Sequence, residues 1–204
     1  ANPEIGGSGV IKVVTTGTIG AFTVEIAGLL DNTNYSFKAY AINAQGTSYT
    51  PVGTFDTLAY TPIETWRNQY FGSTANTGAG ADSASAGDGI VNLLKYALGI
   101  VPGENAASGL PKAKLVNKDS NRYLALTFKR DPARNDVTIV VQAGSDLSGW
   151  TEIARCASGG SFTGLATVTE TQNLDGTLNV EVSDVQAVAG APRRFMRVLV
   201  ERPE

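Results

Sequence analysis

The chain has 204 residues, 23 of them glycine and 17% of them charged, with a formal net charge of −3. This balance excludes the broad basic surface of a nucleic-acid-binding protein, and the lack of a long apolar run excludes membrane insertion by a helix. The sequence has no histidine and one cysteine, which excludes Ser-His-Asp and Cys-His catalysis and histidine-ligated zinc. We therefore expect a protein that is not an enzyme.

The first segment, residues 1–58, is predicted to form short β-strands. Apolar side chains alternate with other residues over 22–27 and again over 35–43. A period of two gives each strand one buried face and one exposed face. Glycine and asparagine residues between these runs predict turns.

Residues 59–111 are predicted to form a short helical hairpin. Thr61 and Glu64 have the spacing of a capping box, with Pro62 in the first turn, and Gly72 is placed to end this helix. A loop of small residues follows. A second helix is predicted over residues 90–98, ended by Gly99.

Residues 112–204 return to strand patterns. Apolar residues alternate over 124–128, 137–143 and 196–200, and clusters of glycine, asparagine and aspartate separate them. Regularly spaced short strands between such turns are typical of a β-sandwich. The whole chain is therefore predicted to be mainly β, with a C-terminal β-sandwich.

The first segment carries a leucine turn at residues 28–35 that ends in Tyr35, then an alternating strand and an Asn43-x-x-Gly46 hairpin. This pattern resembles the second half of a fibronectin type III or bacterial immunoglobulin-like repeat. The resemblance implies a partial sandwich in which Tyr35 is the corner tyrosine that fastens a strand end to upstream backbone. It also implies an open edge for pairing with another chain. That edge comprises Tyr35, Phe37, Ala39 and Ala41.

The remaining segment carries Trp66-Arg67-x-x-Tyr70-Phe71-Gly72, a glycine-rich stretch over 87–99, and Arg193-Arg194-Phe195-x-Arg197. These motifs resemble a C-terminal module common in large secreted bacterial proteins. The resemblance implies an extracellular or cell-surface location and a terminal, structural role.

Residues 87–92, Gly-Asp-Gly-Ile-Val-Asn, look like the core of a dockerin-like or EF-hand-like calcium loop. Asp88, the Ile90 carbonyl and Asn92 match ligand positions five, seven and nine, and Asp82 is a further candidate from outside the loop. Positions one and three hold alanine, and position twelve holds Lys95, so the loop is degenerate. The alternative is a loop in which Asp88 and Asn92 cap the second helix.

Trp66, Tyr70 and Trp150 are candidates for a platform on which sugar rings stack. Trp66 and Tyr70 are four residues apart and share one helix face, so the alternative is that this face packs into the core.

We expect a non-catalytic structural or adhesive region of a secreted or cell-surface protein. Its expected partners are other protein chains bound by strand pairing, or adjacent domains of a larger protein. The alternative is a carbohydrate-binding module appended to a secreted hydrolase, with a glycan as ligand. No cofactor is expected apart from calcium in the degenerate loop.

Overall fold

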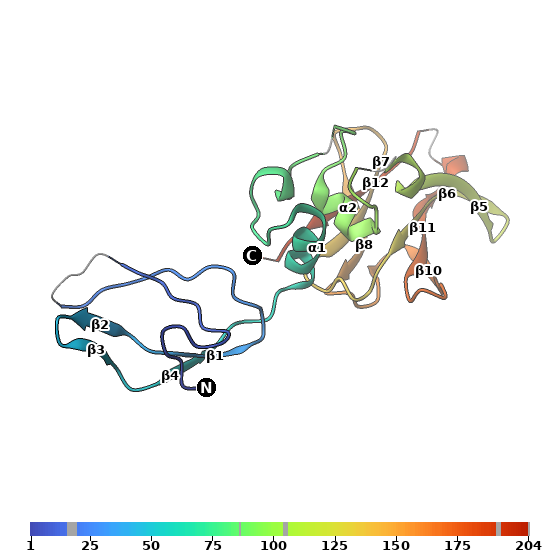
Figure 1. Ribbon diagram of the computed structural model, residues 1–204. Helices are drawn as coiled ribbons and strands as arrows, with labels where there is room; N and C mark the ends of the chain where they lie inside the picture. The colour runs from blue at the N-terminus through green and yellow to red at the C-terminus, as the bar shows by residue number, and fades with distance from the viewer. Residues whose placement is uncertain (16–19, 86, 104–105, 191–192, 204) are drawn as a thin grey trace. The chain divides into compact units, whose positions relative to one another are not determined.

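The structure is a computed structural model that describes residues 1–15, 20–85, 87–103, 106–190 and 193–203 (Figure 1). The chain divides into two compact units, residues 1–60 (unit 1) and 61–204 (unit 2). Antiparallel strands dominate and the helices are short, so the chain is mainly β, as the sequence predicts.

Within its described residues, unit 1 contains two small antiparallel sheets. β1 (Asn34–Phe37) pairs with β4 (Gly53–Asp56), and β2 (Tyr40–Asn43) pairs with β3 (Gly46–Tyr49). Two local predictions are confirmed. The Leu30 backbone N–H donates to the Tyr35 hydroxyl at 2.8 Å, so Tyr35 contacts upstream backbone. The Asn43 side chain accepts from Gln45 N–H at 2.8 Å in the hairpin turn.

Two strand predictions in unit 1 are wrong. Residues 22–27 form no strand, because no described strand lies beside them to complete a ladder, and alternation alone does not satisfy backbone groups. The continuous strand expected over 35–43 breaks at Lys38 and Ala39. The chain changes partner there, since Ala39 already exchanges hydrogen bonds with Thr50 beyond β3.

Unit 2 begins with two helices, α1 (Pro62–Phe71) and α2 (Asn92–Leu98). The predicted capping box of α1 is present in both directions between Thr61 and Glu64, and Gly72 ends the helix in the left-handed conformation at φ 69°. α2 begins at Asn92 rather than at residue 90, because Val91 is extended and forms a β-bridge with Ser85. Short 3₁₀ turns lie at η1 (Gly78–Gly80), η2 (Ala106–Gly109) and η3 (Val188–Gly190).

Two four-stranded antiparallel sheets follow. The first has the order β10-β11-β6-β5 and the second has the order β12-β7-β8-β9. The strands are β5 (Lys112–Lys118), β6 (Asn121–Arg130), β7 (Thr138–Gly144), β8 (Thr151–Ala157), β9 (Thr163–Gly164), β10 (Thr167–Gln172), β11 (Leu178–Ala187) and β12 (Phe195–Glu201).

The core of unit 2 contains side chains from both sheets and both helices. Alternate apolar residues of β6, β7, β8 and β11 are buried together, as a sandwich requires. Ile63 and Trp66 of α1 and Tyr96 and Leu98 of α2 belong to the same buried cluster. The helical segment and the sandwich therefore share one hydrophobic core. Buried members from the sheets include Leu126, Phe128, Ile139, Val141, Ile153, Val180 and Val182.

Candidate functional site

The predicted calcium loop closes around a cation that belongs to the chain itself. Asn92 N–H donates to the Ala84 carbonyl at 2.8 Å and joins the two ends of the loop. The Lys95 ammonium lies 2.8 Å from the Asp88 carboxylate, and the Lys95 side chain is fully buried. This contact, followed by a hydrogen bond from Ile90 N–H, holds the pKa of Asp88 below its ordinary value. Asp88, a predicted calcium ligand, is thus neutralised by lysine.

Asp82 is engaged in the same way by arginine. Arg67, which is buried, forms an ion pair with one Asp82 oxygen, and Arg202 reaches the other at 3.3 Å. The Asn76 side chain donates to that second oxygen at 3.2 Å. Both carboxylate oxygens of Asp82 therefore already have positively charged or hydrogen-bonding partners from within unit 2.

Asn92 is buried at the start of α2, where its amide N–H₂ donates to the carbonyls of Ala79 and Ala81 at 2.8 and 2.9 Å. Its Oδ1 atom has no hydrogen-bond partner among the described residues. The capping interpretation is wrong. The N-cap residue of α2 is Val91, and no side chain makes a capping hydrogen bond there. The Asp88 carboxylate instead accepts from Ile90 N–H, before the helix begins. The described chain contains no group of three or more Asp, Glu or Cys side chains placed to hold a metal.

Asp136 connects the helices to the sandwich. It lies in the turn between β6 and β7, and its two oxygens accept from the Tyr96 hydroxyl at 2.6 Å and from Ile63 N–H in the first turn of α1 at 2.8 Å. Burial, and then the contact with Asp136, raises the pKa of Tyr96 well above its ordinary value. The Asp136 carboxylate therefore joins both helices to the turn between β6 and β7.

The three aromatic residues predicted as a sugar platform have different surroundings. Trp66 is 6% exposed and its ring contacts those of Tyr70, Phe71 and Tyr96, so the side chain is buried. Tyr70 is 37% exposed and contacts Trp66. Trp150 is half-buried, with the Arg197 guanidinium 4.2 Å from its ring centre. Trp66 belongs to the core, as the alternative interpretation of the helix face states.

The predicted pairing edge in unit 1 is divided between two sheets. Tyr35 and Phe37 lie in β1, Ala41 lies in β2, and Ala39 lies in the break between them. Phe55 of β4 lies beside both aromatic residues of β1. Its ring centre is 5.8 Å from that of Tyr35 and 6.0 Å from that of Phe37. Among the described residues, β1 has β4 as its only strand partner, so no strand pairs with its other edge.

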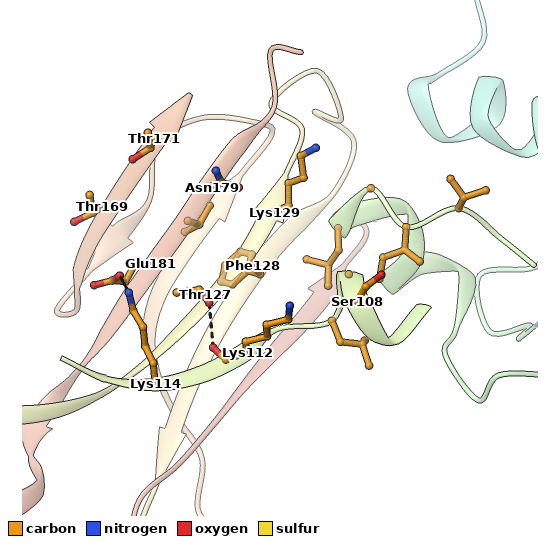
Figure 2. Close-up of a pocket in the computed structure, with 17 residues that line it drawn as sticks. Ser108, Lys112, Lys114, Thr127, Phe128, Lys129, Thr169, Thr171, Asn179 and Glu181 are labelled. Carbon is orange, nitrogen blue, oxygen red and sulfur yellow. Dashed lines mark hydrogen bonds and ion pairs between the residues drawn. The ribbon is translucent and has the colours of Figure 1, made fainter. Parts of the chain in front are cut away.

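A trough of about 610 Å³ lies on the outer face of the first sheet, walled by residues 98–101 and 108–110 (Figure 2). The register places polar side chains in two rows, one across β5, β6, β11 and β10 and the other across β6, β11 and β10. We call this feature the strand trough. Its rows are Lys112–Thr127–Glu181–Thr169 and Lys129–Asn179–Thr171, and its wall includes Ile100, Val101, Ser108 and Leu110.

Sequence reasoning missed the strand trough. The polar halves of the alternating strands were visible in β6 and β11, but alternation does not reveal which strands are neighbours. Only the pairing of β6 with β11 brings Thr127 beside Glu181 and Lys129 beside Asn179.

None of the helices in the described residues is long and apolar enough to cross a membrane. Comparison of the chain with protein-family models, with curated proteins and with solved structures finds no match.

Proposed function

We propose that the chain is a non-catalytic structural module of an extracellular or cell-surface protein, and that it assembles with further copies of itself by strand exchange through unit 1. The observation that carries this proposal is that the described residues of unit 1 form no buried core. No described residue of unit 1 is buried. Large apolar side chains remain exposed there, including Ile11, Val14, Phe22, Ile26, Leu30, Phe37 and Ile42.

Apolar surface of this extent favours burial against another polypeptide, because removing apolar surface from water contributes roughly 25 cal/mol per Å², against which the cost of association must be set. The sheets of unit 1 also point to how that burial occurs. Two-stranded sheets are marginally stable alone, and an open strand edge pairs readily with an added strand. β1 offers such an edge next to the aromatic side chains of Tyr35, Phe37 and Phe55.

The chain also contains a suitable donor strand. Residues 22–27 have strand alternation, with Phe22, Val24 and Ile26 on one side, yet they form no strand within their own molecule. Phe22 is 54% and Ile26 is 45% exposed. Paired with β1 of a second copy, this segment would satisfy its backbone groups and bury its apolar side. We therefore assign the second copy, rather than an unrelated protein, as the occupant of the edge.

A non-catalytic role is supported by the absence of histidine from the sequence and by the state of the carboxyl groups. A general acid at neutral pH needs a raised carboxyl pKa. The carboxyl groups whose pKa departs clearly from its ordinary value in the described chain are all lowered. They are Glu64, Asp88, Asp146, Glu152 and Asp175. The extracellular location is supported by the resemblance of the sequence motifs to secreted bacterial modules.

Light scattering over a wide concentration range tests the assembly. We expect the mass of the wild-type chain to rise with concentration. Val24→Lys places a charge on the apolar side of the donor segment and should keep the chain monomeric. Thr23→Lys places the same charge on the opposite side and should assemble like the wild type.

A synthetic peptide of residues 20–28 provides a test that does not depend on how a variant folds. In excess, it should occupy the β1 edge and stop growth, whereas a scrambled peptide should have no effect. A wild-type chain that stays monomeric at every concentration, or growth that the peptide leaves unchanged, would overturn the proposal.

A further inference from the structure

We propose that the strand trough binds an acidic oligosaccharide, with Lys112 as the residue that contacts a sugar carboxylate. This site lies in unit 2 and is independent of the assembly proposed for unit 1. Its volume, about 610 Å³, falls in the range of small-ligand sites.

The charge of the strand trough favours an anion. Its lining contains three lysines and one glutamate, on a chain whose formal net charge is −3. A local reversal of sign concentrates oppositely charged ligands at that place. The strand trough therefore carries an excess of positive charge on a chain whose net charge is negative.

The three lysines differ in their partners. Lys114 forms an ion pair with Glu181, and Lys129 pairs with Asp175 at 2.9 Å. The Lys112 side chain has neither a hydrogen bond nor an ion pair among the described residues, and it is exposed. In Figure 2 its ammonium group ends between the sheet and Ser108. Lys112 is thus the cation that remains open to a ligand.

The other surfaces of the strand trough suit a sugar ring. Thr169 and Thr171 present exposed hydroxyl groups along the sheet, which match the hydroxyls of a saccharide. Asn179 is exposed beside them and keeps its amide oxygen as an acceptor, while its amide nitrogen donates to Asn173 at 2.7 Å. Val101 and Leu110 in the wall are apolar and half-buried, and they suit the C–H face of the same ring.

A peptide bound as an added strand does not fit this place. The centre of the strand trough is formed by β6 and β11, whose backbones are paired on both sides. They have no open edge for strand addition, so ligand contacts here come from side chains. Phe128 lines the strand trough but is only 6% exposed, so ring stacking does not contribute.

Titration with tetragalacturonate, followed by calorimetry and by backbone amide shifts, tests this inference. We expect shifts at Thr127 and Asn179, and binding that weakens as salt is added. Fully methyl-esterified tetragalacturonate keeps the sugar rings without their charge and should bind far more weakly. Lys112→Met should weaken binding of the acid about tenfold.

Lys118→Met is the matched control, because Lys118 lies on the same strand, β5, but does not line the strand trough. It should bind tetragalacturonate like the wild type. Equal binding of the esterified sugar, or an unchanged affinity in Lys112→Met, would overturn the inference. Equal amide shifts with inorganic phosphate would show a simple anion site and would also overturn it.

Discussion

At the scale of single residues, the loop before α2 shows how a metal site can be replaced by an internal ion pair. A calcium loop gathers several carboxylates around a divalent cation. Here one carboxylate, Asp88, meets the ammonium of Lys95, and a second, Asp82, meets Arg67 and Arg202. The cations come from the chain itself, while the backbone hydrogen bond from Asn92 to Ala84 joins the two ends of the loop.

The Asp88–Lys95 pair predicts unequal effects of removing its two members. Asp88→Asn leaves the fully buried Lys95 charge without its partner, and should lower the thermal midpoint of unit 2 by many degrees. Lys95→Met keeps the side-chain length and leaves the partly exposed Asp88 to be hydrated, so its effect should be small. The double variant should resemble Lys95→Met. Thermal unfolding followed by circular dichroism at neutral pH measures all three.

The same pair predicts a pH dependence. The pKa of Asp88 is lowered in the folded chain, so its stabilising contribution is present above the ordinary value of 3.8. That contribution is lost as the pH falls through the lower, folded pKa, and the wild type should then approach Asp88→Asn. A rise in the wild-type midpoint on adding calcium, or a Lys95→Met chain as unstable as Asp88→Asn, would contradict the internal-cation interpretation.

At the scale of elements, α1 is fixed to the sandwich along one side. Its capping box and Gly72 set its ends, and the Asp136 carboxylate accepts a hydrogen bond from Ile63 N–H in its first turn. Ile63 and Trp66 then bury their side chains in the shared core. Tyr70 is on the same helix but keeps more than a third of its surface exposed, at 37%.

This arrangement predicts that two aromatic substitutions on one helix differ in their cost. Trp66→Ala removes a buried side chain and should lower the free energy of unfolding of unit 2 by about 3–5 kcal/mol. Tyr70→Ala removes a partly exposed one and should cost about 1 kcal/mol or less. Urea denaturation measures both. Similar costs for the two variants would mean that α1 does not pack by its Trp66 side.

At the scale of the whole molecule, the two units differ in how their structure is stabilised. Unit 2 has one hydrophobic core with contributions from strands and helices. Unit 1 has hydrogen-bonded strands and aromatic contacts, but none of its described residues is buried. Stability is therefore expected to be concentrated in unit 2.

Hydrogen exchange should make this difference visible. In dilute solution, the amides of β6, β7 and β11 should be strongly protected and those of residues 20–30 should exchange almost freely. Protection that appears at residues 22–27 and in β1 as the protein concentration rises would show that residues 22–27 of one copy pair with β1 of another. Strong protection of unit 1 in dilute monomers would contradict a unit without a core.

Some features of the structure were predicted correctly from the sequence and others were not. The capping box at Thr61, the ends of both helices at Gly72 and Gly99, and the corner contact of Tyr35 were all predicted. Each depends on residues close together in the chain, whose side-chain and backbone chemistry acts over a single turn. The strand expected over 22–27 failed because a strand requires a neighbour, which local alternation does not supply.

The sequence by itself determined the mainly β class, the two short helices and their terminating glycines, and the lack of histidine chemistry. The tertiary structure alone decided that Trp66 is core, that Lys95 neutralises Asp88, and that the strand trough exists. The physical reason is distance along the chain. Burial and strand pairing join residues that are far apart in sequence, as Thr127 and Glu181 are, and a local pattern carries no information about which of them meet.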